Sequence, residues 1–439
     1  MEIIKTQKDS KKLLHDGYAY LLEKEKCDRT YWKCDKRGIC KGRAIVYEEK
    51  INITQNHSHP PDQKENEAKK IISDIKIMSS STSSSTSNII NECISKSNID
   101  ICTKLPKQDS LKQTVRRTRA SILRAEDYNK TIKGEKFLML EKEDIMIYST
   151  ETNFNTLRKY KRWFCDGTFD SAPTGKQLYT IHSLVGINKT LPLVYCITNN
   201  RNEETYSIIF NFIKNKEIVP ISITIDFERA AINEIKNVFP EAKIYGCFFH
   251  FGQCLWRKLQ GLGLQNWYKN ENNQHIIKKF QALAFLPPDT VHDVFNQLIN
   301  SINDETDEIL SDFLQYFETT WLGIVQRGRR RRPTFDIDLW NVFERMERNL
   351  PRTNNSVEGW HNAFHMRLQI CHPTLQKLLQ KIRLEQAATE LSIRQIETGQ
   401  ELDRKTKKYD DLNKRLKRIF DSFENVNSLE YIDRIACNL

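Results

Sequence analysis

The pattern of apolar and polar positions between residues 160 and 262 changes repeatedly from short apolar runs to longer runs with helical spacing. Short apolar runs with close connections predict strands of an antiparallel meander, and apolar positions at helical spacing predict helices. The expected order is β-β-β-α-β-α-β-α, over residues 161–169, 178–187, 191–198, 202–216, 221–226, 228–239, 243–250 and 251–259. This order predicts an α/β fold with a mixed sheet, followed by a mostly helical pattern from about residue 263.

The chain before this sheet contains two segments of different composition. Residues 16–23, 29–35 and 40–49 have the composition of strands. Residues 63–100 include the run SSSTSSST at 79–86, which offers too little apolar surface to order itself. We therefore expect a flexible Ser/Thr-rich linker over 63–100.

Four potential metal ligands lie in the N-terminal segment. Cys34, Cys40, His57 and His59 have the spacing C-x5-C-x16-H-x-H, which supplies two pairs of ligands suited to tetrahedral zinc. A bound Zn²⁺ would also supply folding energy that such a short segment lacks. The alternative is two free thiols beside a His-rich loop.

Two aspartates lie at strand ends of the predicted sheet. In this topology the first and fourth strands can lie side by side, which places Asp166 and Asp226 in the crevice outside the strand ends. Paired carboxylates there can hold Mg²⁺ through oxygen ligands. Alternatively, Asp166 is a turn residue and Asp226 is a helix N-cap. Asp170 and Glu228 are substitutes, although each is better explained as a cap or surface charge.

A third carboxylate begins a later helix, in the stretch RTNNSVEGWHNAFH at 352–365. The TNNS residues offer side-chain oxygens to cap the helix N-terminus. Glu358, His361, Asn362 and His365 then form a polar stripe beside an apolar face. A glutamate in a first helical turn is also favoured by the helix dipole, so a purely stabilising role is the alternative.

Net charge is +11, from 68 Lys and Arg against 57 Asp and Glu, and part of it is clustered in RRTR (116–119) and RGRRRR (327–332). These blocks are either solvated loops and import signals or contacts to a phosphate backbone. Eleven scattered cysteines indicate a reducing compartment. No apolar run reaches the roughly 18 residues of a membrane span, so we expect no membrane contact.

The N-terminal segment resembles the FLYWCH zinc finger over about residues 3–60. The resemblance is carried by Tyr18 and Tyr20, YWKC (31–34), CKGRA (40–44) and HSH (57–59). It implies one structural Zn²⁺ at Cys34, Cys40, His57 and His59, and binding to DNA or protein.

The region of about 100–430 resembles the Mutator-like element (MULE) transposase domain, through WFCDGTFDSAP, TIDFERAAINEI, GCFFHFGQCLWRKL and RTNNSVEGWHNAFH. The resemblance implies an RNase H-like fold, catalytic Asp166, Asp226 and Glu358, and two Mg²⁺ or Mn²⁺ ions. Cys247 and His250 match a C-x2-H element near the active site. We interpret both, with His361, as DNA or active-site contacts.

The expected parts are a zinc finger (1–62), the linker (63–100), a basic helical DNA-binding region (101–150), an RNase H-like core (151–262), a helical insertion (263–350), the catalytic-glutamate helix (351–370) and a C-terminal helical region (371–439). The last could form a homo-oligomer, bind DNA or pack as a cap on the core.

The expected function is a nuclear transposase that cleaves and joins double-stranded DNA at terminal inverted repeats and target sites. Arg329, Arg330 and Arg331 would lie along the DNA path. The alternative is a domesticated, non-catalytic zinc-finger DNA-binding regulator of transcription.

Overall fold

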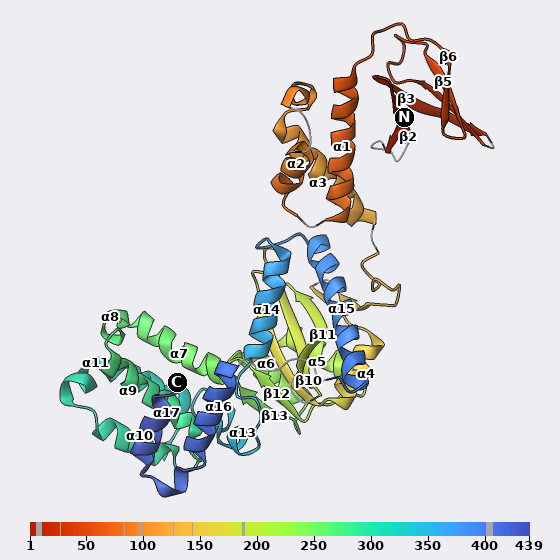
Figure 1. Cartoon of the computed structure of the whole chain (residues 1–439). Helices are drawn as coiled ribbons and strands as arrows, with labels where there is room; N and C mark the ends of the chain where they lie inside the picture. The colour runs from red at the N-terminus through yellow and green to blue at the C-terminus, as the bar shows by residue number, and fades with distance from the viewer. Residues whose placement is uncertain are drawn as a thin grey trace. The chain divides into compact units, whose positions relative to one another are not determined.

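The computed structural model describes residues 1–5, 11–26, 28–82, 84–95, 99–125, 127–142, 144–186, 189–400 and 407–439. These residues form two compact units, Met1–Glu126 and Asp127–Leu439 (Figure 1). Each unit is described by itself below. None of the helices in the described ranges has both the length and the apolar character that a membrane crossing needs.

The N-terminal unit begins with a six-stranded antiparallel meander in the order β1-β2-β3-β4-β5-β6. Its strands are β1 (Glu2–Lys5), β2 (Lys11–His15), β3 (Tyr18–Lys26), β4 (Arg29–Cys34), β5 (Arg43–Tyr47) and β6 (Lys50–Gln55). The three strands expected here are confirmed as β3, β4 and β5. Leu13, Tyr20 and Trp32 form the centre of a small core, which is all that a sheet of this size can bury.

Residues 63–100 do not form the expected flexible linker in the part that the structure describes. They fold into α1 (Gln63–Ser81), α2 (Thr86–Ser95) and the start of a 3-10 helix, η1 (Ile99–Lys104), and α3 (Gln108–Ala125) follows. The serine run made the composition of this stretch typical of a linker, although apolar residues precede the run. These line one face of α1 at helical spacing and pack against α2 and α3, with Ala68, Ile71, Ile75, Ile89, Ile90, Leu111 and Val115 buried.

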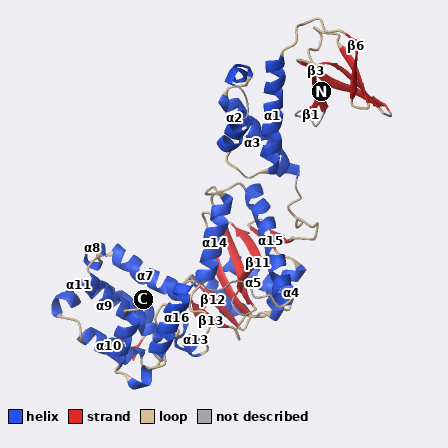
Figure 2. Ribbon diagram, viewed as in Figure 1, coloured by secondary structure: helices blue, strands red, loops and turns tan. Residues whose placement is uncertain are grey.

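The C-terminal unit contains a seven-stranded sheet in the order β13-β12-β9-β10-β11-β8-β7 (Figure 2). Its strands are β7 (Leu138–Lys142), β8 (Ile145–Tyr148), β9 (Arg162–Thr168), β10 (Gln177–Val185), β11 (Lys189–Thr198), β12 (Ser222–Ile225) and β13 (Lys243–Gly246). With helices α5 (Glu203–Lys214), α6 (Arg229–Val238) and α7 (Phe248–Gly261), the predicted element order is confirmed. The first and fourth predicted strands, β9 and β12, pair in parallel as expected.

Two strands of this sheet were not predicted. The region 101–150 was expected to be helical, but β7 and β8 form a hairpin that extends the sheet beyond β11. On β8, Ile145 and Ile147 are buried on one face, and Met146 between them is less buried, as the strand period predicts. The hairpin pairs with the edge of β11 and so satisfies backbone groups that would otherwise be unpaired.

Helices cover both faces of the sheet. Helices α14 (Asn355–Leu368) and α15 (Leu375–Glu397) lie across one face (Figure 1). Phe364 and Leu378 from these helices share a core with Leu178 of β10. On the other face, Tyr179 and Ile181 pack in a second core with α5, α6 and α4 (Glu151–Lys159). The alternation along β10 therefore turns Leu178, Thr180 and His182 toward α14.

The remaining helices form a separate core beside the sheet. They are α7, α8 (Gln265–Tyr268), α9 (Glu271–Ala282), α10 (Val291–Asn300), α11 (Asp304–Phe317), α12 (Ile337–Trp340), α13 (Phe343–Glu347), α16 (Lys407–Phe420) and α17 (Ser428–Ala436). Tyr431 of α17 donates a hydrogen bond to the Phe285 carbonyl at 3.1 Å, and Ile432 and Ile435 are fully buried. The C-terminal region therefore divides, because α15 packs on the sheet while α16 and α17 complete the helical core.

Candidate functional site

The four predicted zinc ligands come together in the N-terminal unit. The ligand atoms of Cys34, Cys40, His57 and His59 all lie within 4.8 Å of one another. Cys34 Sγ is 3.3 Å from His59 Nε2, and Cys40 Sγ is 3.4 Å from His57 Nδ1. Two sulfurs and two imidazole nitrogens at these separations suit the corners of a tetrahedral Zn²⁺ site.

Groups around this cluster favour the thiolate form of Cys40 and orient the histidine rings, as a bound cation requires. Although burial raises the pKa of Cys40, hydrogen bonds from the backbone N–H groups of Ser58 and Gly42 bring it below its ordinary value. The Tyr18 ring stacks on His57 at a centroid distance of 3.9 Å. His59 Nδ1 lies 2.9 Å from the Pro60 carbonyl, which orients Nε2 toward Cys34. The residues present therefore fit a structural zinc ion.

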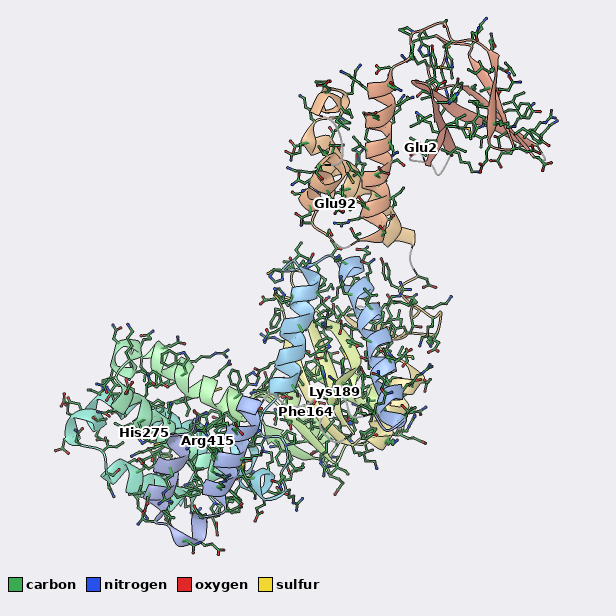
Figure 3. All side chains as sticks on the ribbon, in the orientation of Figure 1. Glu2, Glu92, Phe164, Lys189, His275 and Arg415 are labelled. Atoms are coloured by element: carbon green, nitrogen blue, oxygen red, sulfur yellow. The ribbon has the colours of Figure 1, made fainter. Side chains whose placement is uncertain are left out.

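In the C-terminal unit, the structure places Asp166 and Asp226 at neighbouring strands. Asp166 lies within β9, and Asp226 directly follows β12. The turn role for Asp166 and the N-cap role for Asp226 are wrong, because Asp166 is in a strand and Glu228 holds the N-cap position of α6. Figure 3 labels Phe164, which precedes Asp166 by two residues on β9.

Glu358 lies in the first turn of α14, beside residues from α7. Its Oε1 is 3.4 Å from His250 Nε2, and it forms a cluster within 4.8 Å with His250 and Cys247. Glu358 Oε1 is buried, and among the described residues it accepts no hydrogen bond besides this 3.4 Å contact with His250. A buried carboxylate oxygen with so few donors around it is suited to accept a cation.

The capping role expected for the TNNS residues differs in the structure. Asn354 is the N-cap residue of α14, but its side chain makes no capping hydrogen bond. Its Nδ2 instead donates to the Cys165 carbonyl of β9 at 2.9 Å, and its backbone N–H donates to Cys247 Sγ at 3.1 Å. Asn354 therefore ties the start of α14 to both β9 and the start of α7, and so fixes where Glu358 lies.

Electrostatic coupling links the three carboxylates. Burial, and then the charges of Asp166 and Glu228, raise the pKa of Asp226 to about 6. Burial, and then the charge of Asp166, raise the pKa of Glu358 to about 7. Carboxyl groups whose pKa values are raised by burial and by a neighbouring carboxylate are characteristic of sites that bind protons or cations.

The three carboxylates do not form one tight cluster by themselves. Among the described residues, the groups whose ligand atoms all lie within 4.8 Å include Cys247, His250 and Glu358, but not Asp166, Asp226 and Glu358 together. Burial raises the pKa of the Cys247 thiol to about 11, so it is protonated at neutral pH. His250 is therefore the member of the C-x2-H element that faces the carboxylates, while Cys247 connects α7 to α14.

His361 lies deeper than a DNA contact would. It is buried, with Nδ1 3.2 Å from Asp166 Oδ2 and Nε2 2.9 Å from Thr180 Oγ1. Thr180 and its neighbour His182 were not predicted to be site residues. Their signal was two polar residues between Leu178 and Leu184 on one face of the strand.

The basic block lies before α14 in the sequence, in a hairpin of β14 (Val325–Gln326) and β15 (Arg329–Arg330). Arg329, Arg330 and Arg331 are exposed, and none forms an ion pair within the part of the chain that the structure describes. A hollow of about 450 Å³ is lined by Arg330, Arg331, Arg332, His292, Asp289, Asp336 and Asp338, among others. The acids offset part of the positive potential inside the hollow, so the exposed outer side of the hairpin is the better anion-binding surface.

Comparisons with known proteins match one region in each of the two units. The family model of the FLYWCH zinc finger domain matches residues 3–59, and that of the MULE transposase domain matches residues 162–253. The FLYWCH-type zinc finger-containing protein 1 of Mus musculus is 33% identical over 72 residues, 16% of this chain and 11% of that protein. The Homo sapiens protein of the same name is 29% identical over 72 residues, 16% and 10% of the two chains.

The matched stretch thus spans about a tenth of the length of these curated relatives. The finger match contains all four clustered ligands, and the transposase match contains Asp166, Asp226, Cys247 and His250. The chain carries a FLYWCH zinc finger domain at its N-terminal end and a MULE transposase domain in the sheet of its C-terminal unit.

Proposed function

We propose that this protein is a DNA transposase of the Asp-Asp-Glu type, with an RNase H-like core formed by the sheet of the C-terminal unit. The observation that carries the proposal is the coupling of three carboxylates from β9, the end of β12 and the start of α14. Asp166 raises the pKa of both Asp226 and Glu358, although the three lie far apart in the sequence.

The chain would supply oxygen ligands from Asp166, Asp226 and Glu358 to two Mg²⁺ or Mn²⁺ ions. Such ions, when bound, activate an attacking water or 3′-hydroxyl and stabilise the leaving oxygen of a phosphodiester. The buried Oε1 of Glu358, which accepts no hydrogen bond among the described residues besides its contact with His250, supports this role. His250 lies beside that carboxylate and so limits the positions that Glu358 can adopt.

DNA contacts would come from several surfaces. The zinc finger, with a structural Zn²⁺, and the arginine hairpin would hold the terminal inverted repeats and the target duplex. Exposed arginines without acidic partners can bind DNA phosphates. This binding releases counterions from the DNA, and the affinity that results does not depend on the DNA sequence. A protein that acts on chromosomal DNA in this way would work in the nucleus.

A second candidate is a domesticated DNA-binding regulator without catalysis. The observation that favours it is the incomplete convergence of the carboxylates, since Glu358 clusters with Cys247 and His250 rather than with both aspartates. Such a protein would use the finger and the fold while binding no cation at the carboxylates.

Strand cleavage and strand transfer on terminal-inverted-repeat DNA with Mg²⁺ test the proposal. Asp166→Asn and Glu358→Gln should each reduce both products to background, because each removes a charged oxygen ligand. Asp170→Asn, at an exposed acid near the end of β9, is the matched control and should retain activity. Unchanged activity in the first two variants would refute the assignment.

A further inference from the structure

A chain of buried hydrogen bonds runs from Asp166 into the core, and the proposed chemistry does not use it. His361 Nδ1 lies 3.2 Å from Asp166 Oδ2, and His361 Nε2 lies 2.9 Å from Thr180 Oγ1. Thr180 Oγ1 also lies 3.0 Å from His182 Nε2. All four side chains are buried, so water does not compete for these contacts.

Thr180 has a third partner in this network. Its Oγ1 lies 3.3 Å from the Asp166 carbonyl oxygen, to which it can donate, and within hydrogen-bond distance of both ring nitrogens. A hydroxyl carries one proton and accepts through two lone pairs, so the rings of His361 and His182 can both lie against it. The contact that holds the Asp166 carboxylate is the one from His361 Nδ1, which needs a proton on that nitrogen.

His182 lies at the far end of the network. Its Nδ1 is buried without a hydrogen-bond partner among the described residues. Burial, with His361 nearby, holds the pKa of His182 well below its ordinary value, so the ring is neutral and carries one proton. Nε2 is the nitrogen that contacts Thr180, so the proton is assigned to Nε2.

This arrangement holds Asp166 at both oxygens. Its Oδ1 accepts a hydrogen bond from the Gly167 backbone N–H at 2.9 Å, and His361 contacts Oδ2. Thr180 is the direct partner of Asp166 in the pairing of β9 and β10, so both side chains point to the same face. Helix α14 brings His361 to that face one turn after Glu358.

We infer that His361 is a positioning residue for Asp166, which donates from Nδ1 to the carboxylate and is held in place by Thr180. Helix α14 thereby sets two of the three carboxylates, Glu358 directly and Asp166 through the imidazole. The inference rests on the proposed function only in taking Asp166 as a cation ligand. A histidine that merely fills space would not depend on which nitrogen carries the proton.

Two pairs of variants separate positioning from packing. Thr180→Val removes the hydroxyl at nearly the same volume, whereas Thr180→Ser keeps it. His361→Asn keeps an N–H donor near the place of Nδ1, whereas His361→Gln moves the donor toward the place of Nε2. Thermal unfolding of each full-length variant checks that it folds.

The first readout is the tautomer, measured by imidazole ¹⁵N chemical shifts of the full chain without added Mg²⁺ or Mn²⁺. We expect a proton on Nδ1 of His361. A His361 ring whose only proton is on Nε2 would overturn the inference.

The second readout is Mn²⁺ affinity by calorimetry. We expect Thr180→Val and His361→Gln to weaken binding by about tenfold or more, as is typical when a partner behind a metal ligand is lost, while Thr180→Ser and His361→Asn retain most of the affinity. Equal affinity in all four variants would overturn the inference. Wild-type protein that binds no Mn²⁺ would instead contradict the proposed function, and the tautomer would still decide the inference.

Discussion

At the scale of single residues, the C-terminal site contains buried acids that interact electrostatically with Asp166. Burial and the charge of Asp166 leave Asp226 and Glu358 with pKa values of about 6 and 7. Without a cation, folding therefore favours the protonated forms of these carboxyls. A divalent cation would compete with those protons, since metal ligands bind in the deprotonated state.

This coupling predicts how stability depends on pH. The two pKa values are raised on folding, so their contribution is full below the unfolded pKa of about 4 and is lost as pH rises through about 6 to 7. The thermal midpoint of the metal-free protein should fall over this range more steeply than that of Asp226→Asn/Glu358→Gln. Added Mn²⁺ should stabilise the wild type increasingly as pH rises. Parallel pH profiles for both proteins would contradict this.

The zinc cluster allows a second prediction at this scale. Cys40→Ser should reduce bound zinc from about one ion per chain to none and should unfold the β1–β6 sheet, because its core is too small to fold alone. Metal analysis and hydrogen exchange measure the two effects. Cys371→Ser, at an exposed cysteine outside the cluster, should change neither. Full zinc in Cys40→Ser would show that the cluster is not the binding site.

The sequence allowed the ligands and acids to be predicted but not the residues that hold them. Ligand types with fixed spacing indicate their chemistry locally, as at His57 and His59. Asn354 and Thr180 act through contacts with residues more than a hundred positions away, and no local pattern contains those contacts. Asn354 in particular is a residue type that favours helix caps, but its side chain instead connects α14 to β9.

At the scale of elements, the helices of the N-terminal unit show how a compositional signal can mislead. The serine run falls at the end of α1, where Ser80 and Ser81 hydroxyls donate to the Ile77 carbonyl at 2.7 and 2.9 Å. Serine can thus finish a helix by bonding its own backbone. The apolar stripe before the run decided the structure, whereas the run alone predicted a linker.

Ile75 tests this helical core. It is fully buried between α1 and its neighbours, so Ile75→Ala should cost about 2–5 kcal/mol. Ile77, two positions further along α1 and 53% exposed, is the control, and Ile77→Ala should cost less than about 0.5 kcal/mol. Hydrogen exchange of the α1–α3 amides measures both. Equal exchange in the two variants would mean that α1 does not pack as described.

At the scale of the whole molecule, the described residues form two compact units, and the cluster of zinc ligands lies in the first of them. The C-terminal unit joins a sheet to a helical core that α16 and α17 complete from the far end of the chain. The sequence predicted helices there, but it contained no sign that α15 would join the sheet while α17 joined α9. Such pairings depend on which apolar faces meet, and helical periodicity alone does not specify this.

The proposed DNA contact of the arginine hairpin belongs to this scale, because charge acts over long distances across the molecular surface. Replacing Arg329, Arg330 and Arg331 by alanine should lower DNA affinity equally for unrelated sequences and reduce the slope of log affinity against log salt by about 3. Fluorescence anisotropy over a salt series measures the slope. The control replaces exposed Arg348, Arg415 and Arg434, which removes the same charge from the same helical part. Equal slope changes in both triples would mean that net charge matters and the hairpin does not.

The central claim is that Asp166, Asp226 and Glu358 hold divalent cations in one pocket, and calorimetric titration of the zinc-loaded full chain with Mn²⁺ tests it most directly. The account predicts binding that falls at least tenfold in Asp166→Asn and in Glu358→Gln, with Asp170→Asn unchanged. Absence of Mn²⁺ binding by the wild type, or binding that survives in both variants, would contradict the account and favour the non-catalytic regulator.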